Sequence, residues 1–99
     1  MFIYNVTISI DKAVAKEWHH WMKTTHIPQV MDTNLFTDYK MCKVLNVDDE
    51  GETYSTQYMF KSMPDIEAYQ KEHAPRLQAD MKELYEGKYV AFRTLLEIV

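Results

Sequence analysis

The stretch Lys23-Thr24-Thr25-His26-Ile27-Pro28 has a counterpart later in the chain, Gln70-Lys71-Glu72-His73-Ala74-Pro75, and both end in His-x-Pro. Each copy lies in a helix-like pattern that follows a strand-like run. The two strand-like runs, residues 4–10 and 54–60, also correspond to each other. A β-α-β unit that occurs twice in 99 residues predicts a single domain, residues 1–99, with the β-α-β-β-α-β order of the ferredoxin-like fold.

The residues around each His-x-Pro have helical spacing. Asp11 is expected to cap the first helix, whose predicted apolar stripe is Val14, Trp18, Trp21 and Thr25. The predicted stripe of the second helix is Ile66, Tyr69, His73, Leu77, Met81 and Leu84. Proline removes a backbone donor and crowds the preceding turn, so we expect each helix to end or kink near its His-x-Pro.

Four strands are predicted, over residues 2–10, 38–47, 52–60 and 89–98, and the acidic turn 48–52 joins the middle two into a hairpin. Right-handed crossovers place both helices on one face of a four-stranded antiparallel sheet, with the first and third strands at its centre. The fold class is therefore α+β. The opposite face of the sheet is left uncovered.

An uncovered sheet face that carries aromatic and aliphatic side chains usually marks an interface. We therefore predict a homodimer in which two sheets pack face to face. The alternative is a monomer whose outer face is made tolerably polar by Asn5, Thr7, Ser9, Ser55 and Gln57.

Composition excludes several classes of protein. The hydrophobic content of 46% is too high for a disordered chain, and the net charge of −4 gives no basic footprint for nucleic acid. A single cysteine, Cys42, allows no internal disulfide, and no apolar run is long enough to span a membrane. We expect a cytoplasmic protein that binds neither nucleic acid nor membranes. No metal or cofactor is expected.

The sequence also resembles a small bacterial family known only as a domain of unknown function. The residues that carry the resemblance are Tyr4-Asn5-Val6, Glu17-Trp18, Trp21-Met22-Lys23, His26-Ile27-Pro28, Leu35-Phe36-Thr37, Tyr54-Ser55, Gln57-Tyr58, Tyr69-Gln70, Glu72-His73-Ala74-Pro75 and Val90-Ala91-Phe92-Arg93-Thr94-Leu95-Leu96-Glu97. That family is similar to the dimeric α/β-barrel superfamily, which includes antibiotic-biosynthesis-type monooxygenases, haem-degrading oxygenases and muconolactone isomerases. The resemblance implies the fold and the dimer. It implies no activity.

Two histidines are candidate catalytic residues. His73 lies in the middle of its predicted stripe and is expected to face the sheet, where its imidazole could transfer protons. His26 lies at the edge of its stripe and is the weaker candidate. The structural alternative is that each ring only hydrogen-bonds a carbonyl freed by the neighbouring proline.

Five further residues are candidate ligand contacts. Arg93 stands in an apolar strand and needs either an anionic ligand or a carboxylate partner, on a neighbouring strand or on the second copy of a dimer. Tyr4, Asn5 and Tyr69 could position a ligand by hydrogen bonds, and Tyr58 could also bond one, although core packing explains the three tyrosines equally well.

Three functions follow from these residues. The first is a small-molecule-binding barrel with its site between helices and sheet, possibly a cofactor-independent oxygenase or isomerase. The second is a non-catalytic structural or regulatory dimerisation module. The third is haem binding. The haem-degrading members of the superfamily use a histidine on the second helix, an asparagine on the first strand and a tryptophan; His73 and Asn5 match the first two, but Trp18 and Trp21 are on the first helix, so the set matches only in part. A large cavity that reaches a histidine and Arg93 would favour the first function, and a filled layer between helices and sheet the second.

Overall fold

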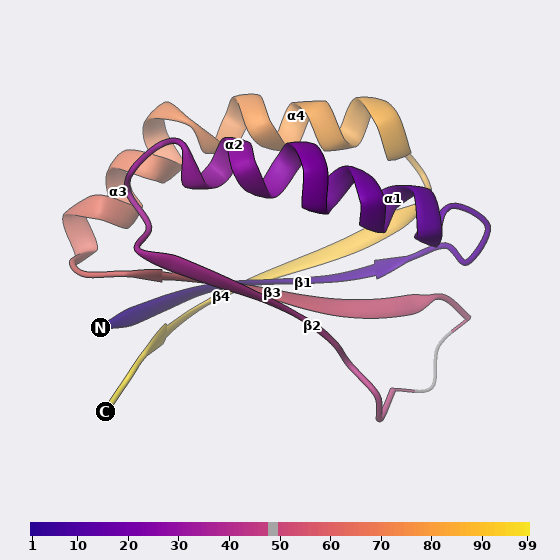
Figure 1. The fold of residues 1–99 in the computed structure, drawn as a ribbon, viewed down its shortest axis with the longest axis horizontal. Helices are drawn as coiled ribbons and strands as arrows, with labels where there is room; N and C mark the ends of the chain where they lie inside the picture. The colour runs from indigo at the N-terminus through magenta and orange to yellow at the C-terminus, as the bar shows by residue number, and fades with distance from the viewer. Residues whose placement is uncertain (48–49) are drawn as a thin grey trace.

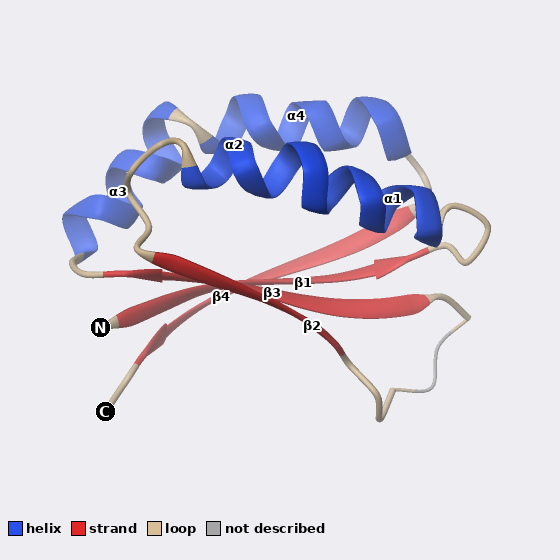
Figure 2. Ribbon diagram, in the orientation of Figure 1, coloured by secondary structure: helices blue, strands red, loops and turns tan. Residues whose placement is uncertain are grey.

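The computed structural model describes residues 1–47 and 50–99. In it a four-stranded antiparallel sheet carries all of the helices on one face (Figure 1). The strands are β1 (Phe2–Ile10), β2 (Asp38–Lys43), β3 (Glu52–Phe60) and β4 (Tyr89–Glu97), in the order β2-β3-β1-β4. The other face of the sheet is bare (Figure 2). The ferredoxin-like prediction is confirmed, with the first and third strands at the centre.

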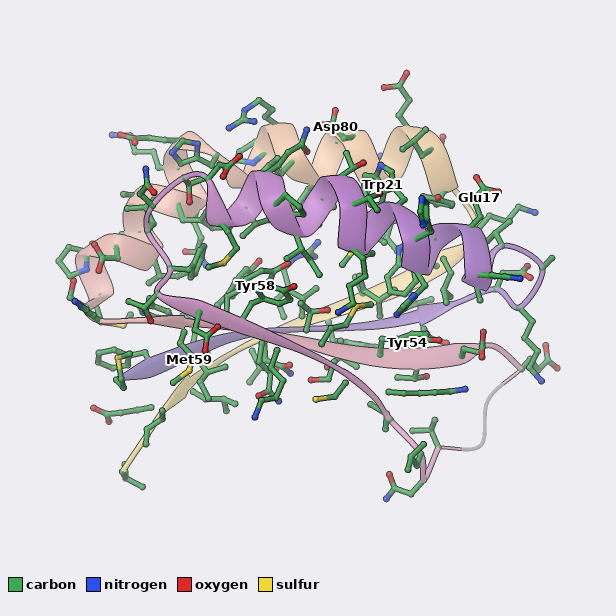
Figure 3. The ribbon with its side chains drawn as sticks, viewed as in Figure 1. Glu17, Trp21, Tyr54, Tyr58, Met59 and Asp80 are labelled. Carbon is green, nitrogen blue, oxygen red and sulfur yellow. The ribbon has the colours of Figure 1, made fainter. Side chains whose placement is uncertain are left out.

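Strand β1 pairs along its whole length with both of its neighbours. Val6, for example, lies opposite Thr56 of β3 and opposite Arg93 of β4. Because side chains alternate along a strand, these three residues all face the helices, whereas Asn5 faces the bare side. Figure 3 shows the same alternation in β3, where Tyr58 and Met59 lie on opposite sides of the sheet.

The first helical segment continues past its proline. It consists of α1 (Ala15–Trp21), the π-helical turn η1 (Met22–His26) and α2 (Ile27–Met31). The amide of Ile27 donates to the carbonyl of Met22, five residues earlier. The spacing of the buried residues reflects the inserted residue, because Met22 and Ile27 are five positions apart. The buried residues of the segment are Ala15, Trp18, Met22, Ile27 and Val30. A π-turn is thus the form that the predicted kink takes, and it keeps Met22 and Ile27 on the sheet face.

The second helical segment breaks in two, into α3 (Met63–Glu72) and α4 (Ala74–Tyr85). His73 stands at the junction with a φ of −124°, outside helical geometry. The break changes the phase of the buried stripe, which continues through Ala74, Leu77, Met81 and Tyr85. The prediction that His73 and Leu84 belong to this stripe is therefore wrong: Leu84 is 58% exposed.

Aromatic side chains fill one end of the layer between helices and sheet. The ring of Phe36 lies 4.9 Å from that of Tyr69 and 5.3 Å from that of Tyr58. Tyr4 stacks against the same group, with its ring centre 6.2 Å from that of Tyr58. Ring pairs at such separations stabilise a core beyond the area that they bury.

Some predicted boundaries differ from the observed ones. The second strand ends at Lys43 instead of residue 47, and the last ends at Glu97. The first helix begins at Ala15, after a turn in which Asp11 accepts a hydrogen bond from the amide of Ala13 at 2.8 Å. The predicted acidic turn falls partly on residues 48 and 49, outside the described part of the chain. Within that part, no helix is both long and apolar enough to cross a membrane.

The bare face of the sheet carries an apolar area on β4. Val90 is 57% exposed, Phe92 66% and Leu96 42%. Next to it, on β1 and β3, lies a polar network in which Ser55 Oγ donates to Asn5 Oδ1 at 2.6 Å and Asn5 Nδ2 donates to Thr7 Oγ1 at 3.1 Å. We call Val90, Phe92 and Leu96 the β4 apolar patch.

Gly87 ends α4 in the left-handed backbone conformation, with φ of 76°. No atom outside the chain neighbours lies within 4 Å of the position that a Cβ would take. A side chain there is therefore opposed by backbone strain alone. We expect Gly87→Ala to lower the free energy of unfolding by about 1–2 kcal/mol, measured by urea denaturation at fixed protein concentration. Gly87→Asn, which tolerates this conformation better, should lose less. Equal losses for both variants would contradict this account.

Candidate functional site

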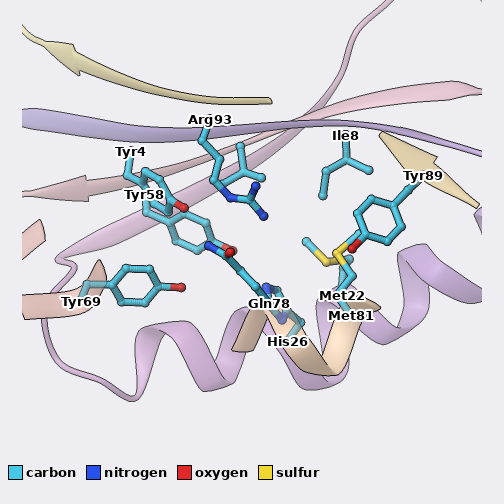
Figure 4. A pocket seen from close by; sticks show the side chains of 11 residues that line it. Tyr4, Ile8, Met22, His26, Tyr58, Tyr69, Gln78, Met81, Tyr89 and Arg93 are labelled. Carbon is cyan, nitrogen blue, oxygen red and sulfur yellow. The ribbon is translucent and has the colours of Figure 1, made fainter. Parts of the chain in front are cut away.

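A cavity lies between the helices and the sheet, and side chains from both layers converge on it (Figure 4). Much of its polar lining comes from six elements, each of which supplies one of the residues Tyr4, His26, Tyr58, Tyr69, Gln78 and Arg93. Most of the remaining wall is aliphatic or sulfur-containing: Val6, Ile8, Met22 and Met81. The sequence-predicted residues His26, Tyr4, Tyr69 and Arg93 are thus brought together.

The π-turn determines where His26 points. The extra residue in η1 holds Met22 and Ile27 on the sheet side, and His26, at the end of that turn, reaches the cavity. Its ring stacks on Trp21, with ring centres 5.0 Å apart. Its Nδ1 atom is buried and has no hydrogen-bond partner among the described residues. A buried nitrogen without a partner is uncommon in folded proteins and marks a place where a ligand or water can bind.

The charge state of His26 follows from this burial. Loss of hydration lowers the pKa of His26 from 6.5 to about 4, Asp80 opposes the shift, and the positive charge of Arg93 adds to it. The imidazole is therefore neutral at pH 7. A neutral ring with a free nitrogen can accept a proton or a hydrogen bond.

Arg93 enters the cavity from β4, opposite Val6. Arg93 is an exposed residue, and among the described residues no carboxylate lies within ion-pair distance of it. The carboxylate on a neighbouring strand, which sequence analysis considered as its partner, is thus not found in this chain. Arg93 carries the only charge among the side chains that line the cavity.

Three of the tyrosines that line the cavity stay protonated. Burial raises the pKa of Tyr4, Tyr58 and Tyr69 above the usual range of a phenol, and for Tyr4 the nearby Arg93 and Gln78 offset part of the rise. Their hydroxyl groups can therefore donate hydrogen bonds at neutral pH.

The structure does not bring two of the predicted residues to this cavity. His73 lies at the break between α3 and α4, half-buried, and its Nδ1 is 2.9 Å from a guanidinium nitrogen of Arg76. Asn5 lies on the opposite face of the sheet, within the polar network. His73 and Asn5, the pair on which the haem interpretation depends, are thus separated by the sheet. This arrangement gives haem binding no support.

Sequence analysis did not name Gln78 or Met22 as site residues. Tyr58, which it considered as a hydrogen-bonding residue, lines the cavity and lies opposite Tyr4 in the paired register. A signal for the π-turn was also present: the apolar residues Met22 and Ile27 are five positions apart instead of three or four. Gln78 could not be placed, because the phase of α4 depends on the break at His73.

The cavity is small. Its volume is about 30 Å³, which holds about two water molecules. The pocket around it, measured out to open solvent, has about 450 Å³ of space. The layer between helices and sheet is therefore mostly filled. A larger ligand needs the exposed Arg93 side chain to move.

The depressed pKa of His26 predicts a pH-dependent stability. Between pH 6.5 and pH 4 the unfolded chain takes up a proton at His26 that the folded protein does not, so stability falls as the pH falls. We expect the wild type to lose about 2 kcal/mol more than His26→Gln between pH 7.5 and pH 5 in urea denaturation. NMR titration of the ring should give a midpoint well below 6.5. His20→Gln, at an exposed position, is the control and should behave as the wild type. A midpoint near 6.5 for His26 would contradict its burial.

Comparison with known proteins gives a fold and a family. Three solved structures share the fold: an ethyl tert-butyl ether d (ethd) family protein from Bacillus halodurans (TM-score 0.69, 10% identity, 100% of both chains covered), a candidate antibiotic biosynthesis monooxygenase from Nitrosomonas europaea (0.68, 10%, 100% of this chain and 99% of that one), and a dimeric ferredoxin-like protein from an uncultured marine organism (0.71, 10%, 99% and 94%). No curated protein matches the sequence.

At identities this low, the likeness to solved structures establishes the fold alone. The family assignment comes from a separate match, to the family described as Domain of unknown function (DUF4286), which covers residues 1–99. Because that match spans the whole chain, the protein belongs to the DUF4286 family.

Proposed function

We propose that this protein is a small-molecule-binding homodimer whose ligand occupies the cavity between the helices and the sheet. The observation that carries the proposal is the meeting of Arg93, which has no ion-pair partner in the described chain, with the unpartnered Nδ1 of His26 in one cavity. A guanidinium group without a carboxylate and an imidazole nitrogen without a hydrogen-bond partner are both available to a ligand. An apolar wall with a few convergent polar groups is typical of ligand sites.

The small volume sets how the ligand enters. Arg93 is an exposed residue with a long side chain, so it can swing outward without disturbing the core. Tyr58 and Met22, in contrast, belong to the buried part of the lining, with exposures of 2% and 1%. Entry past Arg93 therefore brings the ligand into contact with the guanidinium group.

The chemistry open to such a site is proton transfer. An isomerase, or an oxygenase that works without a cofactor, must remove a proton from its substrate, and a neutral imidazole can accept one at pH 7. His26 is the lining residue suited to this task, while Tyr4, Tyr69 and Arg93 could hold the substrate. One solved structure with this fold bears the name of an antibiotic biosynthesis monooxygenase, which is compatible with this class of reaction. Fold alone does not decide it.

The β4 apolar patch supports the homodimer. Val90, Phe92 and Leu96 project from the bare face of the sheet, and burying them against a second copy would remove their apolar surface from water. The polar network next to the patch is hydrogen-bonded within the chain, so covering it would leave few groups unsatisfied. A structure with this fold is described as a dimeric ferredoxin-like protein.

The second candidate function is a non-catalytic dimerisation module. The mostly filled layer between helices and sheet favours it, together with the β4 apolar patch. In that case the cavity would be a packing defect that holds water.

The ligand site is tested by a thermal-shift screen of small aromatic acids, hydroxylated aromatics and their neutral analogues. We expect at least one compound to raise the melting temperature, and we expect His26→Gln to weaken its binding about 10-fold, because a lost hydrogen bond in a dry site costs about 1.5 kcal/mol. His73→Gln is the matched control, since His73 lies outside the cavity. Binding that depends on His73 but not on His26 would place the site elsewhere.

The dimer is tested by light scattering coupled to size exclusion at micromolar concentration. We expect a mass twice that of the 11.8 kDa chain. Phe92→Asp puts a charge into the β4 apolar patch and should yield monomers. Leu84→Asp, at an exposed apolar residue on the helical side, should remain dimeric. A monomeric wild type would rule out this interface.

A further inference from the structure

We propose that the ligand of this cavity is a small organic monoanion with a flat, unsaturated body, whose carboxylate or equivalent oxyanion binds Arg93. The inference rests on the proposed ligand site and narrows the class of molecule that it takes. It comes from the charges, the hydrogen-bond donors and the shape of the wall.

The charge of the cavity comes from one residue. Tyr4, Tyr58 and Tyr69 are phenols with raised pKa values and His26 is neutral, so at pH 7 Arg93 supplies the one positive charge among the side chains that line the cavity. The carboxylate of Asp80, which opposes the lowering of the His26 pKa, does not line this cavity. Asp80 and Trp21, both labelled in Figure 3, line a separate groove on the helices. A ligand with one negative charge neutralises the site, whereas a cation would meet Arg93 without compensation.

The hydrogen-bonding groups near Arg93 suit an oxyanion. The hydroxyl group of Tyr4 lies close enough to Arg93 and to Gln78 for both side chains to lower its pKa. In Figure 4 the side chains of Arg93 and Gln78 point toward one another. A planar guanidinium with a phenol and an amide beside it presents several N–H and O–H donors to one small volume. Arginine binds carboxylates through paired, charge-assisted hydrogen bonds of this kind.

The shape of the wall indicates the body of the ligand. The rings of Tyr4, Tyr58 and Tyr69 lie together, with ring centres 6.2 Å and 5.8 Å apart for the pairs that include Tyr4. Met22 and Met81 supply polarizable sulfur groups. Ring faces and thioethers bind flat unsaturated groups well, and a narrow cavity excludes bulky saturated ones.

The opposite end of the cavity adds a second recognition point. Nδ1 of His26 is buried and without a partner, so a ligand that carries a hydroxyl group away from its carboxylate would donate a hydrogen bond there. This predicts that a hydroxybenzoate binds more tightly than benzoate, provided that the hydroxyl group reaches His26.

The experiment compares benzoate with benzamide, a neutral molecule of the same shape, by NMR titration and calorimetry on the wild-type protein. We expect benzoate to bind at least 10-fold more tightly, because a charge-assisted hydrogen bond to Arg93 is worth more than a neutral one. Arg93→Gln should abolish this preference, because benzoate loses a charge-assisted hydrogen bond and benzamide only a weaker, neutral one. Arg93→Lys should restore part of it. Arg76→Gln, which removes a surface arginine next to His73, is the matched control and should keep the full preference.

Each outcome has a separate meaning. If benzamide bound in this cavity as tightly as benzoate, the monoanion inference would be wrong, but the ligand site would stand. If neither probe nor any compound of the wider screen bound, both the inference and the ligand site would fall. If Arg93→Gln changed the dimer mass and left benzoate binding unaltered, Arg93 would be an interface residue, and the inference would be wrong.

Discussion

The pairing of β1 with both β3 and β4 is the constraint on which the cavity depends. Val6 stands between Thr56 and Arg93 in register, so the helix-facing residues of three strands form one continuous floor. A shift of one residue in either pairing would turn Arg93 or Tyr58 to the bare face and remove it from the cavity. The same alternation puts Asn5 in a polar network on the other side of the sheet. The chemistry of the site is therefore set first by backbone hydrogen bonds in the sheet.

The two His-x-Pro motifs show how one local constraint can have two structural results. In the first half, η1 takes up an extra residue, the helix continues, and His26 reaches the cavity. In the second half, the chain leaves helical geometry at His73, and that ring contacts Arg76 near the surface. In both cases the proline ring crowds the carbonyl four residues earlier, so the regular helix cannot continue unchanged. The packing around each helix decides whether the backbone forms a wider turn or breaks.

The two faces of the sheet have different physical roles. The helix-covered face holds a tightly packed aromatic group and a small cavity with one net positive charge. The bare face holds the β4 apolar patch and a polar network that is hydrogen-bonded within the chain. A ligand site and a dimer interface can therefore coexist, because they use opposite sides of the same strands. Arg93 and Phe92 are neighbours in sequence but face these two different surroundings.

The sequence by itself determined the order of the elements, the α+β class and the central position of β1 and β3, because alternation and helical spacing are local properties of the chain. It also identified His26, Tyr4, Tyr69 and Arg93 as residues that could share a site. It misplaced His73 and Leu84 on the buried stripe of the second helical segment. Whether a proline widens or breaks a helix, and which strand face meets the helices, depend on contacts between distant segments. Only the tertiary structure decided that His26, and not His73, lies in the cavity, because the phase of each helix is fixed by its packing on the sheet.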